Sequence, residues 1–305
     1  MKKAVSVILA LSLFVLSACS LQPPQWAKPS NSDKKKEFTI GLSISTLNNP
    51  FFVSLKKGIE KEAEKRGMKV IIVDAQNDSS KQTSDVEDLI QQGVDALLIN
   101  PTDSSAISTA VESANSIGVP VVSIDRSAEQ GKIETLVASD NVKGGEMAAE
   151  FIADKLGKGA KVAELEGVPG ASATRERGSG FHKIADQKLD VVTKQSADFD
   201  RTKGLTVMEN LLQGHPDIQA VFAHNDEMAL GALEAINSSG KDILVVGFDG
   251  NKDAISSIND GKLSATVAQQ PELIGKLATE AADQILHGKK VKKTISAPLK
   301  LETKK

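Results

Sequence analysis

This chain of 305 residues lacks the residue patterns of several common functional sites. The four histidines have neither HxH nor HExxH spacing, which argues against a zinc site. No GxGxxG or GxxxxGK(S/T) follows a strand and opens a helix, and GxSxG is missing, so neither a nucleotide site nor a serine-hydrolase site is indicated. The net charge of −3 argues against a general nucleic-acid binder.

Calcium is the one metal for which part of a pattern is present. Asp249, Asn251 and Asp253 alternate as at the start of a calcium-binding loop. The sixth position is then Ala254 where glycine is needed, and the twelfth is Asp260 instead of a bidentate glutamate. We therefore expect no metal and no cofactor.

The only cysteine, Cys19, follows an export signal. Lys2 and Lys3 precede an apolar run at 4–16, which is too short to span a bilayer and typical of a signal peptide. The run ends in Leu-Ser-Ala-Cys, which resembles a bacterial lipobox, although an incidental free thiol after an ordinary signal is the alternative. We predict a lipoprotein signal peptide at 1–18 and acyl chains on Cys19 that hold the protein at the cell membrane. Residues 19–36, rich in proline, serine and lysine, are predicted to be a tether.

Aromatic residues are scarce: nine phenylalanines, one tryptophan and no tyrosine. The stretch STLNNPFF at 45–52 nevertheless places two phenylalanines side by side. Asn49 suits a helix N-cap and Pro50 suits the first helical position. Neighbouring residues of a helix point about 100° apart. Phe51 and Phe52 are therefore not expected to share one core stripe, which leaves one ring for another role.

Short apolar runs alternate with amphipathic helical segments from Phe38 onward. Such runs, followed by helices, indicate parallel sheets that are covered on both faces. The predicted strands lie at 38–45, 68–74, 94–100, 119–125, 161–167, 189–195, 218–225 and 243–249. About ten strands suit two doubly wound α/β domains better than one.

Polar residues follow these runs directly. They are Ser45, Asp74, Asn100, Asp125, Asn225 and Asp249. Ligands of open parallel sheets bind at the carboxyl ends of strands. The alternative is that these residues only cap the following helices, and we expect this of about half of them, Asp74 and Asn100 first.

The charged residues near these strand ends favour binding over catalysis. Asp125 and Asp249 could form a glycosidase pair. However, Arg126 adjoins Asp125, and Arg175 and Arg177 lie in RERG. Arginines lower the pKa of neighbouring carboxyl groups, whereas a general acid needs a raised pKa. Phenylalanines among Asp, Asn and Arg suit a sugar, whose hydroxyls need hydrogen-bonding partners and whose C–H faces need apolar surface.

The motifs in combination carry a family resemblance. From about residue 37 to the C-terminus, STLNNPFFVSLKKG, INPTDS, IDR, ASDN, TRERG, ADFDR, NDEMALGAL, VVGFDG and VAQ resemble the substrate-binding proteins of bacterial ABC sugar importers, among them those for D-ribose. The resemblance implies two α/β lobes that are joined by a three-strand hinge and close on the sugar. It also implies a first lobe of 37–139 and 272–295, and a second of 140–271 and 296–305.

The resemblance also implies the site. Polar side chains hydrogen-bond the hydroxyls, phenylalanines line or stack on the ring, and Arg177 is chosen over Arg175, which is expected to be its structural partner. The expected binding residues are Asn49, Phe51, Phe52, Asp125, Arg126, Arg177, Phe199, Asn225, Phe248, Asp249 and Gln269.

The resemblance implies a monomer that binds D-ribose and delivers it to a membrane permease, without catalysis. Allose and related sugars remain alternatives for the ligand. A sugar-sensing receptor component and a sugar-processing enzyme are alternatives for the function. A sugar-responsive repressor would need an N-terminal helix-turn-helix where this chain has an export signal.

Overall fold

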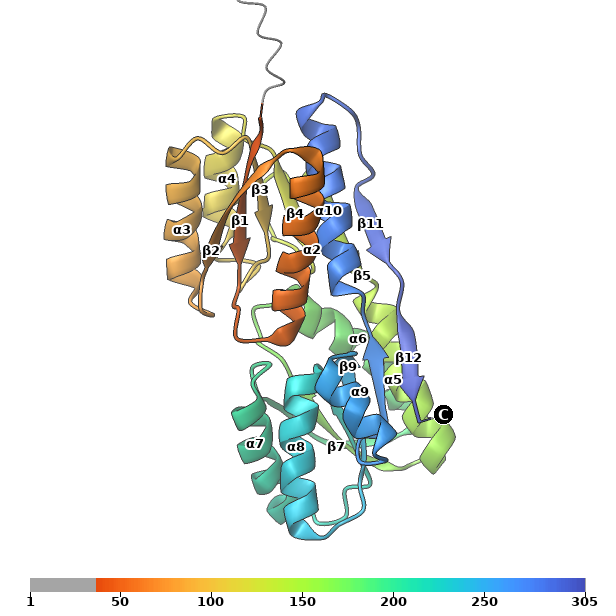
Figure 1. The fold of residues 1–305 in the computed structure, drawn as a ribbon. Coiled ribbons are helices and arrows are strands. Elements are labelled where there is room, and N and C mark those ends of the chain that lie inside the picture. The colour runs from red at the N-terminus through yellow and green to blue at the C-terminus, as the bar shows by residue number, and fades with distance from the viewer. Residues whose placement is uncertain (1–36, 305) are drawn as a thin grey trace, which may run out of the picture. The chain divides into compact units, whose positions relative to one another are not determined.

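The computed structural model describes residues 37–304 (Figure 1). The predicted signal peptide, Cys19 and the tether lie outside the described residues. No helix within 37–304 is long and apolar enough to span a membrane.

The first lobe is built on a six-stranded sheet in the order β11-β5-β4-β3-β1-β2, in which all paired strands are parallel. Helices α2 and α10 pack on one face and α3 and α4 on the other, and each face has its own apolar core. The elements are β1 (Thr39–Ile44), α2 (Pro50–Arg66), β2 (Lys69–Asp74), α3 (Ser79–Gln91), β3 (Ala96–Ile99), α4 (Ser108–Ser116), β4 (Val121–Ile124), β5 (Thr135–Ser139), α10 (Pro271–Leu286) and β11 (Thr294–Ala297).

The second lobe repeats this arrangement with the order β12-β10-β9-β8-β6-β7, and only β12 runs antiparallel to its neighbour. Helices α5 and α6 cover one face, and α7, α8 and α9 cover the other. The elements are α5 (Asn141–Leu156), β6 (Lys161–Glu166), α6 (Ser172–Lys188), β7 (Asp190–Ser196), α7 (Arg201–Gly214), β8 (Ala220–Ala223), α8 (Asp226–Ser239), β9 (Leu244–Asp249), α9 (Lys252–Asn259), β10 (Ala265–Ala268) and β12 (Lys300–Thr303).

The chain passes between the two sheets three times: after β5, between β10 and α10, and between β11 and β12. The predicted fold class, two doubly wound lobes joined by three connections, is confirmed. Every strand predicted from an apolar run is present.

Local chemistry sets the start and end of α2 as expected. Asn49 is the N-cap and accepts a hydrogen bond from Phe51 N, Pro50 is the first helical residue, and Gly67 ends the helix at φ 67°. Helix α10 crosses close to α2 because both carry a glycine at the contact. A Cβ on Gly275 would lie 2.3 Å from Leu55 O. This tight pair fixes the end of α2 that faces the second lobe.

Candidate functional site

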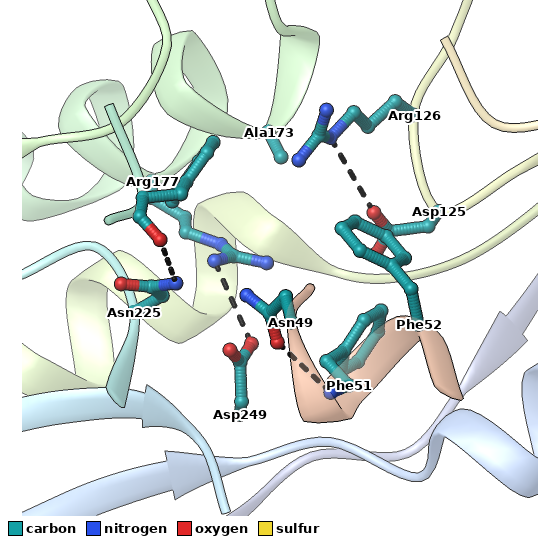
Figure 2. A pocket seen from close by; sticks show the side chains of 10 residues that line it. Asn49, Phe51, Phe52, Asp125, Arg126, Ala173, Arg177, Asn225 and Asp249 are labelled. Atoms are coloured by element: carbon teal, nitrogen blue, oxygen red, sulfur yellow. Dashed lines mark hydrogen bonds and ion pairs between the residues drawn. The ribbon is translucent and has the colours of Figure 1, made fainter. Parts of the chain in front are cut away.

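A small cavity lies between the lobes. Its lining comes from the start of α2, the end of β4, α6, the loop after β7 and the ends of β8 and β9 (Figure 2). The lining residues are Asn49, Phe51, Phe52, Asp125, Arg126, Ala173, Arg177, Phe199, Asn225 and Asp249.

Hydrogen bonds join the lobes beside the cavity. Ser104 N donates to Gly170 O at 2.9 Å, and Ser172 N donates to Ser104 Oγ at 3.2 Å. Ser127 N donates to Ser172 Oγ at 3.0 Å. The lobes therefore meet in a closed arrangement around the cavity.

Three lining residues have a left-handed backbone that is unfavourable for residues other than glycine. The φ angles are 64° at Asp125, 59° at Phe199 and 121° at Asp249. Such strain costs about 1–3 kcal/mol per residue and persists only where the surroundings enforce it. The fold thus holds these three side chains in a fixed direction at the ends of their elements.

Arg126 lies between two phenylalanine rings. Its guanidinium carbon is 5.2 Å from the Phe52 ring centre and 5.1 Å from that of Phe199. Nη1 donates to Pro101 O at 3.1 Å, and Nε lies 3.6 Å from Asp125 Oδ2. Burial lowers the pKa of Arg126 to about 10, so the side chain is still cationic at neutral pH.

Arg177 is held from several sides. Nε donates to Asn141 Oδ1 at 2.9 Å, and Nη1 donates to His224 O. The guanidinium carbon lies 3.8 Å from the centre of the Phe248 ring, and Nη1 lies 3.8 Å from Asp249 Oδ1. Its direction is therefore set before any ligand binds.

The two aspartates are buried acceptors with raised pKa values. Burial raises the pKa of Asp125, against the opposing charge of Arg126. Burial likewise raises the pKa of Asp249 to about 7, against the opposing charge of Arg177. These directions reverse the expectation that the arginines lower both pKa values, because the cost of burying the charge exceeds the attraction of the arginines.

Unpartnered polar atoms occur at the site. Within residues 37–304, Asp125 Oδ1, Arg126 Nε and Gln269 Oε1 are buried without a hydrogen-bond partner. Buried polar groups are normally paired, and an unpaired group costs about 1–3 kcal/mol. Of these three residues Asp125 and Arg126 line the cavity, so Asp125 Oδ1 is an acceptor that a ligand hydroxyl can satisfy.

Phe51 and Phe52 are both buried and pack edge to face with ring centres 5.2 Å apart. The prediction that one ring would lie off the core stripe is wrong. Both rings contact the core of the first lobe, and both also line the cavity. At the first turn of α2 the apolar core continues into the cavity wall. A side chain there can therefore contact the core and line the cavity at once.

Two predicted binding residues lie behind the lining. Phe248 packs in the core of the second lobe with its ring against Arg177. Gln269 Nε2 donates to Asp249 Oδ1 at 2.9 Å. Arg175 is exposed and contacts Gly170 O and Glu129 instead of Arg177.

The capping roles expected for Asp74 and Asn100 are wrong. Asp78, not Asp74, caps α3, and Asp74 Oδ1 accepts from Gln76 N within a turn. Asn100 is fully buried, accepts from Ser45 Oγ at 2.6 Å and donates to Asp125 Oδ2 at 3.3 Å. It orients a lining carboxyl group and caps no helix.

Other contributors had no distinctive sequence signal. Ala173 lines the cavity with a methyl group. His224 contributes its backbone oxygen to Arg177, and Asn141 contributes its side chain. Within the described residues, no group of three or more His, Cys, Asp or Glu side chains could hold a metal ion.

Known proteins that are similar to this chain are binding proteins. A family model described as "Periplasmic binding protein domain" matches residues 40–290. The chain is 92% identical over 305 residues to the ribose import binding protein of Bacillus subtilis (strain 168), covering 100% of both chains. It is 54% identical over 268 residues to the ribose import binding protein of Escherichia coli (strain K12), covering 87% of this chain and 90% of that protein. The solved structure of Caulobacter myo-inositol binding protein, bound to myo-inositol, matches with a TM-score of 0.83 at 36% identity, covering 87% of this chain and 93% of that one.

Proposed function

Because the chain belongs to the periplasmic binding protein domain family, we propose that it is the extracytoplasmic component that captures D-ribose for an ABC importer. One observation carries the proposal: a small closed cavity between two lobes, in which fixed arginines, buried aspartates and phenylalanine rings meet. The names of the two ribose import binding proteins support ribose as the ligand and a binding role without catalysis.

The lining residues fit the two kinds of surface that a sugar presents. Asp125 and Asp249 accept hydrogen bonds from hydroxyls, and Arg126 and Arg177 donate to hydroxyl oxygens. The rings of Phe51, Phe52 and Phe199 cover the C–H faces. Asn49 and Asn225 each cap a helix through Oδ1, which orients their amide groups at the cavity wall. Gln269 and Phe248 act through Asp249 and Arg177.

A ligand that contacts both lobes favours the closed arrangement, since it binds that state better than the open one. The membrane permease would then recognise the closed monomer. We keep 37–139 with 272–295, and 140–271 with 296–305, as the proposed boundaries of the two moving lobes.

Isothermal titration calorimetry tests the ligand. The purified protein, freed of bound sugar by unfolding and refolding, is titrated with ribose, allose, galactose, glucose, xylose and arabinose. We expect ribose to bind with a Kd of about 1 μM or tighter, and the others at least about 100-fold (roughly 2.7 kcal/mol) more weakly. Tighter binding of allose than of ribose would identify allose as the ligand in place of ribose. Chemical conversion of any sugar would contradict the binding role.

We further propose that Cys19 carries the lipid that holds the protein at the cell membrane. The lipobox-like Leu-Ser-Ala-Cys at 16–19 supports this, and two acyl chains suffice for stable anchoring. Mass spectrometry of the membrane-extracted protein is expected to show a first peptide that begins at an acylated Cys19. Cys19→Ser should remove the lipid mass and release the protein from membranes. An unmodified Cys19 thiol in the wild-type protein would contradict the anchor.

A further inference from the structure

Asp226 is buried directly behind the sugar site without lining the cavity. It is fully buried at the first position of α8, next to the lining residue Asn225. Its Oδ2 accepts a hydrogen bond from Asn251 N at 2.7 Å. Its Oδ1 accepts from Thr266 Oγ1, also at 2.7 Å. Both oxygens are therefore used within the protein, which distinguishes Asp226 from a ligand residue.

These two hydrogen bonds hold the turn that carries Asp249. Asn251 lies two residues after Asp249, and the intervening Gly250 donates its N–H to Thr266 Oγ1 at 3.3 Å. Thr266 also lies on β10 and is paired with Gly247 of the adjacent strand β9. Asp226 and Thr266 thus connect the turn to the neighbouring strand.

The turn needs such restraint because its backbone is strained. Asp249 has φ 121° and Gly250 has φ 77°. A side chain other than glycine is rarely found at the first of these values and returns to a relaxed conformation unless its neighbours prevent it.

The close fit around Asp226 is visible at Gly247. A Cβ at this position would lie 2.3 Å from Asp226 Oδ1, so β9 approaches the carboxyl group as closely as a glycine allows. Burial raises the pKa of Asp226, and the negative charge of the neighbouring Asp249 carboxylate raises it further. The carboxyl group of Asp226 is thus packed against β9 and held by two hydrogen bonds.

We propose that Asp226 is a positioning residue for sugar binding, which acts with Thr266 to hold Asp249 in the strained backbone conformation that directs its carboxylate into the cavity. This inference rests on the proposed ribose binding. It assigns Asp226 and Thr266 no contact with the sugar.

The test is a double-mutant cycle on ribose affinity. Thr266→Val removes the hydroxyl that connects Asp226 to Gly250, while Asp249→Asn removes the charge that the connection is proposed to position. Thr279→Val is the matched control, because Thr279 is also fully buried and donates one hydroxyl hydrogen bond, to Gly275 O at 3.0 Å on α10. Calorimetry gives the Kd of each variant, and thermal unfolding gives its stability.

We expect Thr266→Val to weaken ribose binding about tenfold and Thr279→Val to change it less than about twofold, at similar losses of stability. In the Asp249→Asn background, Thr266→Val should weaken binding less than about threefold further, because the group that it positions has already been changed. Asp226→Ala, which removes both acceptor oxygens, should weaken binding more than Thr266→Val does.

An unchanged Kd in Thr266→Val and Asp226→Ala, or an equal tenfold loss in both Asp249 backgrounds, would overturn the positioning role. If Asp226→Ala does not fold, Thr266→Val alone decides. Failure of the folded wild-type protein to bind ribose would instead overturn the proposed function.

Discussion

Arg177→Ala is expected to weaken ribose binding by about 1,000-fold and to destabilise the protein by about 3–5 kcal/mol. Arg177 is buried, its Nε and Nη1 already donate to Asn141 and His224, and its guanidinium stacks on Phe248. Its removal takes a fixed donor from the sugar and leaves Asp249 buried without its cationic neighbour. Calorimetric titration and thermal unfolding measure the two losses.

The matched control is Arg175→Ala, two residues earlier on the same helix. The Arg175 side chain is 46% exposed and makes an ion pair with Glu129, so we expect a change in Kd below about threefold and a stability change below about 1 kcal/mol. Arg177→Lys keeps the charge but loses the planar fork and the stacking. Its ribose affinity should therefore lie between those of the wild-type protein and Arg177→Ala. Equal effects of Arg175→Ala and Arg177→Ala would contradict the assignment.

Periodicity and strand ends predicted the fold class well because both features are local. Apolar runs showed the strands, and Asn49, Pro50 and Gly67 showed the limits of α2. The strands β5, β10, β11 and β12 were not predicted individually. Strands β10, β11 and β12 each hold a single large apolar residue, which leaves no apolar run to recognise.

The site was predictable where polar residues follow strands, and less so where the role depends on burial. Asn100 and Asp74 occupy the same sequence context, yet only Asn100 is buried beside a lining carboxyl group. Asp226 follows Asn225 directly, and nothing in HNDE distinguishes the residue at the cavity from the one behind it. These distinctions depend on how segments distant in the sequence pack together, for example Asp226 with Thr266.

The same packing dependence reverses the expected pKa directions. The sequence places arginines beside the aspartates, which predicts lowered pKa values. The fold buries Asp249, and burial raises its pKa from 3.8 to about 7. A binding site that excludes water around its acceptors thus makes their ionisation costly in the closed arrangement.

This cost predicts that ribose affinity falls with acidity below about pH 7. Sugar hydroxyls donate to the ionised carboxylate, so binding at lower pH requires Asp249 to release its proton. The Kd should rise by up to about tenfold per pH unit below pH 7 and level off above about pH 8. Calorimetry at pH 6 in buffers of different ionisation enthalpy should show release of about one proton per ribose. An affinity that is constant from pH 5.5 to 8 would contradict ionisation of Asp249 on binding.

The stability of the ligand-free protein should change in the opposite sense. The pKa of Asp249 is higher in the folded than in the unfolded protein, so its contribution to stability is complete below about pH 4 and is lost as the pH rises through about 7. Asp125 and Asp226 also have raised pKa values, so part of the pH dependence of stability persists without Asp249.

Asp249→Asn, whose amide tolerates a left-handed backbone, is expected to be about 1–2 kcal/mol more stable than the wild-type protein at pH 8 and no more stable at pH 4. The same variant should bind ribose about 100-fold more weakly at pH 8, with an affinity that no longer falls with acidity near pH 7. A variant that is less stable than the wild-type protein at pH 8 would show that the attraction of Arg177 exceeds the cost of burying the Asp249 charge.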